Sequence, residues 1–420
     1  MRIRFPLSVS LPLIVAAGAV SAHEGQSELL EELIVYARAQ EMMGVAESAS
    51  EGVVGYDDIT LPPILRVGEL VEAVPGMVAT QHSGTGKANQ YFLRGFNLDH
   101  GTDFSAFANG VPINMRTHGH GHGYLDLNFL ITELVATTSY RKGPYSALVG
   151  DFSSAGSVNF DFYDRLDESL IQATVGEFGY YRGLLAGSID AGDGVFTGAL
   201  DYSTYSGPWE LDEDLDATKF YGAYSGHLGE NEMRIALSGY SSSWTSTDQI
   251  PRRAVLAGDL DPRGYLDPDL GGHTDRHELT GAIANDDWVW MAYIVDYDFG
   301  LYSNFTYFLD DPVQGDQFEQ VDQRTIYGTR IDGERDLAFS SRPLTFRWGG
   351  DIRYDDIDEV SLYRTVARQR MDIVRQDTVG QFSASVYGDL GIDINERLRT
   401  SVGLRADYMD WDVTAFRSQN

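Results

Sequence analysis

A long run of alternating apolar and polar residues fills the chain from Asp167 to its last residue. Such alternation is typical of β-strands with one buried face. Beyond residue 22, no segment approaches the ~20 apolar residues that a membrane-spanning helix needs. If this chain enters a membrane, it must do so as a closed barrel, because lipid cannot satisfy the backbone polar groups of open strands. We expect about eleven strands, at residues 168–177, 180–190, 195–205, 218–228, 232–243, 277–286, 288–309, 323–336, 343–356, 376–391 and 397–412.

The joins between these strands alternate in length. Short joins fall at residues 191–194, 229–231, 286–287, 338–341 and 393–396, and longer ones at 206–217, 244–276, 310–322 and 357–375. Outer-membrane barrels place short turns on the periplasmic side and longer loops outside. Residues 167–420 are therefore predicted to form an antiparallel transmembrane β-barrel.

Charge and cysteine content narrow the classes of partner. The formal net charge is −32, from 63 acidic and 31 basic residues, and there is no cysteine. Such a chain would be repelled by nucleic acid, so we expect no nucleic-acid partner. Solvated acidic loops and affinity for cationic ligands both remain open. Disulfides and thiolate metal sites are excluded.

The N-terminus has the order of a secretory signal peptide. Arg2 and Arg4 precede an apolar stretch from Leu7 to Val20, and small residues follow up to Ala22. We therefore expect residues 1–22 to be removed as a signal peptide. The alternative, a buried N-terminal helix, would not explain why basic, apolar and small residues follow in this order.

Residues 46–166 are predicted to form a compact α/β domain. Residues 67–74 have helical spacing that ends at Pro75-Gly76, and residues 128–134 resemble a short helix. Short strands are expected at 91–93, 104–108, 135–140 and 157–162.

Three motifs occur in order within this domain. Arg94-Gly95-Phe96 follows a short strand, and Asn109-Gly110-Val111-Pro112 forms a turn. Lys142-Gly143-Pro144 comes next, followed by Ser146 to Gly150 and Gly156 to Asn159. This succession resembles the plug domain of TonB-dependent outer-membrane receptors, and the resemblance covers nearly all of the chain.

The resemblance implies a gated importer of the Gram-negative outer membrane. A small plug would block a barrel of about 22 strands, and a scarce ligand would be imported without any reaction, so the chain is not expected to be an enzyme. The expected partners are the TonB energy-transducing protein, outer-membrane lipids and a small-molecule or metal ligand. An odd number of strands cannot close a single-chain bacterial barrel. We therefore expect a truncated gene or partial sequence holding about half of the barrel.

The segment 23–45 lies where the family has its TonB box. The residues that would form the box are Glu32, Leu33, Ile34, Val35, Tyr36 and Ala37. Their apolar members favour an extended backbone, which can add a strand to a partner's sheet edge. A short amphipathic helix that packs on the plug is the alternative, because the spacing also suits a helix.

The motif arginines and glycines would have structural roles. By the resemblance, Arg94 and Arg141 would pair with carboxylates of the barrel wall; exposure on plug loops is the alternative. Gly95 and Gly143 would provide backbone conformations that a side chain blocks. Phe96 and Pro144 complete the two motifs.

The loop from Met115 to Tyr124 carries the main candidate ligand-binding residues. They are Arg116, His118, His120, His122 and Tyr124, with glycines between the histidines. By the resemblance, this loop rises to the outward apex of the plug. Imidazole binds Zn, Cu and Ni, and glycines let the backbone curl so that alternate residues can converge. A flexible loop that contacts a siderophore or haem is the alternative.

A second candidate metal pair is His273 and His277, near the 244–276 loop with Asp267, Asp269 and Asp275. No cofactor is required; Zn, Cu, Ni or an iron chelate would be the transported ligand. A carbohydrate or cobalamin ligand remains open, because Trp209 and Trp244 begin predicted loops. A non-functional truncated receptor is a further alternative. A passive or adhesive barrel is disfavoured, since it would need no plug motif.

Overall fold

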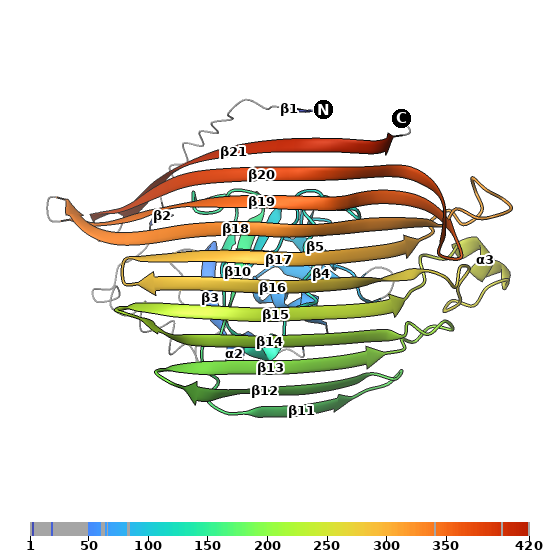
Figure 1. The fold of residues 1–420 in the computed structure, drawn as a ribbon, viewed down its shortest axis with the longest axis horizontal. Coiled ribbons are helices and arrows are strands. Elements are labelled where there is room, and N and C mark those ends of the chain that lie inside the picture. The colour runs from blue at the N-terminus through green and yellow to red at the C-terminus, as the bar shows by residue number, and fades with distance from the viewer. Residues whose placement is uncertain are drawn as a thin grey trace.

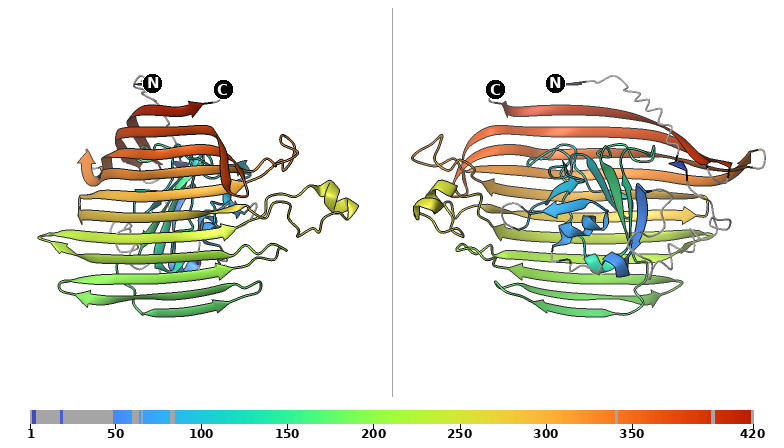
Figure 2. Two further views of the ribbon diagram at one scale, coloured as in Figure 1. Left: turned by 45° about the vertical axis from the view of Figure 1, so that its right-hand side comes forward. Right: turned by 180° about the vertical axis from the view of Figure 1, so that it is seen from behind.

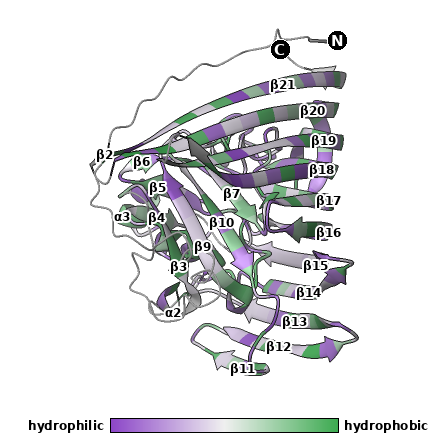
Figure 3. Ribbon diagram, turned by 90° about the vertical axis from the view of Figure 1, so that its left-hand side faces the viewer, coloured by the Kyte–Doolittle hydropathy of each residue, from purple (hydrophilic) through white to green (hydrophobic). Residues whose placement is uncertain are grey.

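The computed structural model describes residues 2–3, 18–19, 49–59, 64, 66–81, 85–339, 342–395 and 398–418. A large curved antiparallel sheet, here called the wall, holds a smaller domain, the plug, against its concave face (Figures 1 and 3). Within these residues, no helix is long and apolar enough to cross a membrane.

The wall contains eleven long strands in chain order, each antiparallel to the next. This confirms the predicted fold class. Two short segments, β1 (Arg2–Ile3) and β2 (Gly18–Ala19), pair with the last of these strands. The strands are β11 (Leu170–Val175), β12 (Tyr181–Ala191), β13 (Gly194–Tyr205), β14 (Leu215–Leu228), β15 (Asn231–Thr245), β16 (Gly271–Asn285), β17 (Trp288–Ser303), β18 (Phe318–Phe339), β19 (Arg342–Val366), β20 (Gln369–Asn395) and β21 (Leu398–Ser418).

Alternation along each strand separates two faces of the wall. Leu184 is 1% exposed and faces the plug, whereas its neighbour Leu185 is 51% exposed on the convex face. Ala199 and Leu200 repeat this pattern on β13. A convex face that carries many exposed large apolar side chains is what a lipid-facing barrel surface requires.

The joins define two ends of the wall. One end has short turns, such as residues 192–193, 229–230 and 286–287, and the other has the loops 206–214, 246–270 and 304–317. The short helix α3 (Arg252–Ala257) lies in the second of these loops (Figure 1). The predicted long loop at 357–375 is wrong, because β19 and β20 extend through it to a turn at 367–368.

The plug is built from two small sheets and short helices (Figure 2). One sheet has the order β3-β9-β10-β7-β8, with β10 parallel to β7, and the other has the order β4-β5-β6. The predicted helix at 128–134 is reduced to η2. The elements are β3 (Glu51–Gly55), α2 (Tyr56–Ile59), η1 (Val67–Ala73), β4 (Met77–Thr80), β5 (Gln90–Leu93), β6 (Phe96–Asn97), β7 (Phe104–Ala108), β8 (Val111–Pro112), η2 (Thr132–Leu134), β9 (Val135–Lys142) and β10 (Gly156–Phe162).

The plug has its own apolar core. Leu70, Tyr91, Phe104 and Phe160 are at most 1% exposed and belong to one cluster made only of plug residues. Burial of such side chains contributes ~1.5–3 kcal/mol each. The plug therefore has an apolar core to which the wall contributes no side chain.

Candidate functional site

The plug lies in a defined orientation between the two ends of the wall. The loop Met115–Tyr124, here called the His loop, contacts Gln320 and Asp322 near the start of β18, just after the long loop 304–317. At the other end, Arg234 at the start of β15 donates to the carbonyls of Phe162 and Tyr163, where the chain leaves the plug. The His loop therefore lies toward the long-loop end.

The base of the His loop is closed by backbone hydrogen bonds. Met115 and Tyr124 exchange both N–H···O=C bonds, at 3.0 and 3.1 Å. The hydroxyl of Tyr124 accepts from the amide of Ala88 at 3.1 Å, and Arg116 pairs with Asp151. Arg116 and Tyr124, which were predicted to contact ligand, are thus engaged in holding the loop.

His118 is packed into the plug–wall contact and is 6% exposed. Its ring stacks on Tyr124 with centroids 4.0 Å apart, and its Nε2 lies 3.1 Å from the hydroxyl of Tyr297. Its Nδ1 accepts from the amide of His120 at 3.1 Å. Since Nδ1 accepts, Nε2 carries the proton and donates to Tyr297. Both nitrogens of His118 are therefore occupied.

The remaining loop histidines diverge. His120 Nδ1 lies 2.9 Å from Gln320 Oε1, and His120 Nε2 lies 3.3 Å from Nε2 of His100. His122 is exposed. The predicted convergence of His118, His120 and His122 is not seen, because the loop turns His118 inward and leaves His122 outside. His100 was not identified from the sequence, because its proximity to His120 arises from the tertiary fold.

Burial lowers the pKa of all three inward histidines. The pKa of His118 lies well below its usual value, because of burial and the nearby Arg324 and His100. Burial, with His100 and Lys87, lowers the pKa of His120 to about 3. Burial also lowers the pKa of His100. These rings are neutral at pH 7 and can present nitrogen lone pairs.

Buried charges of the wall hold the His loop in place. Arg324 is paired with Asp322 at 2.7 Å and with Asp355 at 3.1 Å, and all three side chains are 0% exposed. Arg324 donates to the carbonyl of Thr117, and Asp322 accepts from the amide of Gly119 at 3.0 Å. Complete pairing is what permits charges to be buried at this depth.

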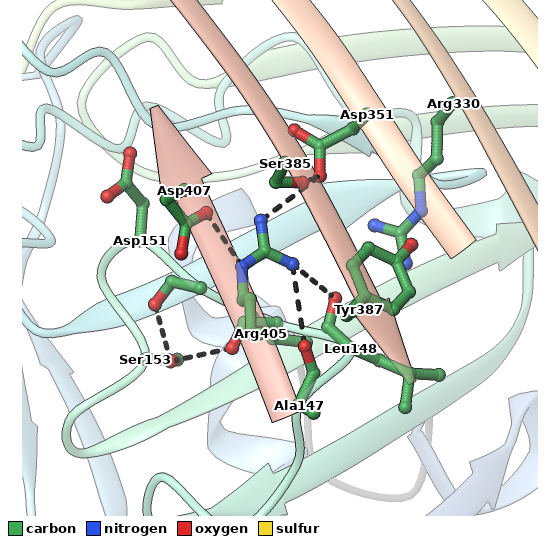
Figure 4. Close-up of polar contacts among 12 residues, drawn as sticks. Ala147, Leu148, Asp151, Ser153, Arg330, Asp351, Ser385, Tyr387, Arg405 and Asp407 are labelled. Carbon is green, nitrogen blue, oxygen red and sulfur yellow. Dashed lines mark hydrogen bonds and ion pairs between the residues drawn. The ribbon is translucent and has the colours of Figure 1, made fainter. Parts of the chain in front are cut away.

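A different polar contact joins the plug segment 147–152 to β19–β21. Arg405 Nη1 lies 3.5 and 3.3 Å from the carbonyl oxygens of Ala147 and Leu148, and its Nη2 lies 3.1 Å from Asp351 (Figure 4). Its Nε lies 2.8 Å from Asp407. A cavity of about 60 Å³ adjoins this contact, which is room for water.

The second predicted metal pair is not brought together. His273 and His277 both lie within β16 on the exposed face, four residues apart, so their Cα atoms are separated by ~13 Å. His273 instead lies 3.0 Å from Asp298. Among the described residues, no group of three His, Asp or Glu side chains lies close enough to hold a metal as it stands.

Other predicted residues also find different surroundings. Arg141 pairs at 2.9 Å with Glu51 of the plug itself, so the expected pairing of Arg141 with a carboxylate of the wall is wrong. Arg94 and Phe96 are exposed, as is Pro144. Gly95 and Gly143 have φ of 80° and 93°, conformations that suit glycine.

Trp244 and the predicted TonB box are the remaining candidates. Trp244 is 3% exposed against the plug and is no loop platform. The predicted TonB box, Glu32 to Ala37, lies outside the described residues.

Residues 45–157 match the TonB-dependent receptor plug domain. Most of the chain resembles solved structures at low sequence identity. The ferric citrate transporter FecA has a TM-score of 0.71 at 15% identity, with 96% of this chain and 60% of that chain covered. The siderophore receptor PiuA from Acinetobacter baumannii gives 0.69 at 14%, covering 91% and 62%. The copper transporter OprC gives 0.63 at 15%, covering 90% and 57%.

This chain spans about 60% of the length of those proteins. The match to the plug domain is consistent with the position of the plug against the concave face of the wall and with the fold of the solved structures. The solved structures that share this fold are named as transporters or as a siderophore receptor. Residues 45–157 therefore form a plug domain of the TonB-dependent receptor kind, and the chain combines this plug with a wall of eleven strands in a fold that it shares with the solved structures named above.

Proposed function

We propose that this protein is an outer-membrane receptor that imports a metal ion or metal chelate in a TonB-dependent, energised step. The observation that supports this most is the plug held inside the wall with a histidine-rich loop toward the long-loop end. Long loops of such barrels face the exterior. A ligand arriving from outside would meet this end first.

The proposed ligand class follows from the donors at that end. His100 and His120 present neutral imidazole nitrogens, which suit Cu, Ni and Zn. Three solved relatives carry ferric citrate, copper or siderophore in their names. Burial of Trp244 removes one aromatic platform that a carbohydrate ligand would use.

Energised opening requires the plug to separate from the wall somewhere. The contact around Arg405 is polar and adjoins a cavity, so water can replace its hydrogen bonds. The contact of Ile131 and Leu134 with β12–β15 is apolar, and exposing it would cost free energy. We infer that a path opens beside segment 147–152.

The proposed TonB contact is the segment Glu32 to Ala37, which would add a strand to TonB. In cells that produce the protein, radiolabelled ferric citrate, Cu²⁺, Ni²⁺ and Zn²⁺ are offered with and without a protonophore. We expect at least one probe to accumulate only in energised cells. Val35→Pro removes a backbone donor, so it should abolish accumulation while surface binding persists.

Accumulation that continues unchanged in the presence of protonophore would point to a passive pore. Failure of every probe to accumulate in energised cells would contradict import of these metals and of ferric citrate. Normal accumulation by Val35→Pro would place the TonB contact elsewhere.

A further inference from the structure

Two histidines from different parts of the plug meet at its apex. His100 lies between β6 and β7 and is 5% exposed, whereas His120 belongs to the His loop. Their Nε2 atoms are 3.3 Å apart, and their ring planes are inclined at 56°. The proton positions on these two rings determine what this contact can do.

His100 has its proton on the far nitrogen. Its Nδ1 lies 3.0 Å from the backbone carbonyl oxygen of Asn89. A carbonyl oxygen can only accept, so Nδ1 must donate. The Nε2 of a neutral His100 therefore carries a lone pair.

The same assignment holds for His120. Its Nδ1 lies 2.9 Å from Oε1 of Gln320, and Nε2 of Gln320 donates to the carbonyl of Gly119 at 2.9 Å. That second bond fixes the orientation of the Gln320 amide, because a flipped amide would place its Oε1 against the carbonyl oxygen of Gly119. His120 Nδ1 therefore donates to Gln320, and its Nε2 also carries a lone pair.

Two acceptor nitrogens thus face each other at 3.3 Å. Two facing acceptors repel each other unless a proton or a metal cation lies between them. Two imidazole ligands at ~2.0–2.1 Å from a tetrahedral metal are separated by about 3.3 Å. Donation of the outer N–H to a carbonyl oxygen is also the usual way in which a protein orients a metal-binding histidine. The spacing and the outer hydrogen bonds both fit a metal site.

We propose that His100 and His120 bind a borderline divalent metal ion, such as Cu²⁺, Ni²⁺ or Zn²⁺, at the plug apex. This proposal rests on the proposed function, and it names the two side chains that would bind the imported metal ion. His118 is excluded because both its nitrogens are engaged, and His122 is exposed to solvent.

The protein supplies only part of the coordination shell. Asp99 Oδ1 lies 3.9 Å from His100 Nε2, and its side chain is 57% exposed, so a small rotation brings an oxygen donor to the same ion. Water or a chelator supplies the other positions. A partial shell suits a site that must release its metal inward, because fewer protein bonds must be broken.

The first test uses the purified full chain in detergent, with Cu²⁺ as the probe and electron paramagnetic resonance as the readout. The parent should bind one Cu²⁺ with hyperfine coupling to two imidazole nitrogens. His100→Gln and His120→Gln should each lose that signal. His227→Gln, which alters an exposed histidine at the far end of β14, should keep it.

Gln320→Leu removes the hydrogen bond that orients His120, together with the one that Gln320 donates to the carbonyl of Gly119. It should weaken Cu²⁺ binding about 10–100-fold. If His100→Gln binds Cu²⁺ with parental affinity and coupling, the proposal is wrong. Loss of the signal in His122→Gln, with His100→Gln unaffected, would assign the metal to the loop histidines instead.

A second measurement needs no variant, in case substitution at the buried His100 prevents folding. Crystals of the parent soaked in Zn²⁺ should show an anomalous peak between the two Nε2 atoms. A peak only elsewhere, or none, would overturn the proposal. Both tests measure metal binding without TonB and without an energised membrane. If energised uptake occurs but this site binds no metal, only the site proposal is wrong. Metal binding without energised uptake refutes only the proposed function.

Discussion

The plug meets the wall through two kinds of contact. Toward β12–β15, Ile131 and Leu134 pack against apolar side chains such as Leu184 and Ala236. Toward β19–β21, segment 147–152 is held by Arg405 and adjoins a cavity (Figure 4). Apolar burial resists separation in proportion to the area exposed, whereas polar groups exchange one partner for water at small net cost. The first contact would hold the plug, and the second would let it move.

One polar contact between wall and plug is fully buried, and there we expect the largest effect of a substitution. Arg324→Met would leave Asp322 and Asp355 without their shared cation at 0% exposure. We expect the free energy of unfolding to fall by about 3–5 kcal/mol. Chaotrope unfolding followed by tryptophan fluorescence measures this loss. A change close to zero would mean that these charges are solvated.

The apolar contact should also be sensitive. Leu134 is 1% exposed, and Leu134→Ala would remove buried methyl groups and leave a cavity. The expected loss of unfolding free energy is about 2–5 kcal/mol. Leu185→Ala on the convex face provides the matched control in the same unfolding assay, and it should cost less. Equal losses would break the distinction between plug-facing and convex positions.

Asp126, which lies on the plug beneath the His loop, should make stability depend on pH. Burial raises its pKa to about 6 from 3.8. The groups around it are Tyr91, Tyr124, Asn128, Lys219, Tyr240, Arg276 and Tyr297. The carboxyl of Asp126 ionises at a lower pH in the unfolded chain than in the folded protein. The free energy of unfolding is therefore highest below about pH 4, and it falls as the pH rises to about 6.

Asp126→Asn keeps an oxygen that can accept from the amide of Asn128 but does not ionise. Relative to the parent, it should gain roughly 3 kcal/mol in unfolding free energy at pH 7 and none at pH 4. Unfolding curves at both pH values test this. A gain of equal size at both would exclude the carboxyl's ionisation as the cause.

The smallest effect is expected at the polar contact. Arg405 and its partners Asp351 and Asp407 are 14%, 27% and 26% exposed, so water screens the pairs. Arg405→Gln should lower the unfolding free energy by about 1 kcal/mol or less. A loss as large as that of Leu134→Ala would show that this contact is not the weaker one.

Much of the fold could be predicted, because alternation in strands such as β13 and β14 reports one buried face directly. The predicted loop at 357–375 failed because β19 and β20 continue past the apolar part of the wall, where polar residues occupy both faces. The motif glycines were also predictable, since Gly95 and Gly143 require positive φ.

The site was less predictable than the fold. The spacing of His118, His120 and His122 could not reveal which ring turns inward, because glycines permit many loop conformations. His100 approaches His120 only through the packing of β5, β7 and the loop base, which is a tertiary effect. The wall partner Gln320 is 200 residues from His120 in the sequence, and no local pattern connects them.

The central claim, that the plug separates from the wall at segment 147–152, can be tested with one disulfide. A Cβ built at Gly403 lies 2.8 Å from Cβ of Ala147, so cysteines at both positions need only a small shift to reach bonding geometry. The chain has no other cysteine. We predict that energised uptake by Ala147→Cys/Gly403→Cys stops under oxidising conditions and recovers on reduction, while each single variant transports normally. Parental uptake by the fully cross-linked protein would contradict the claim.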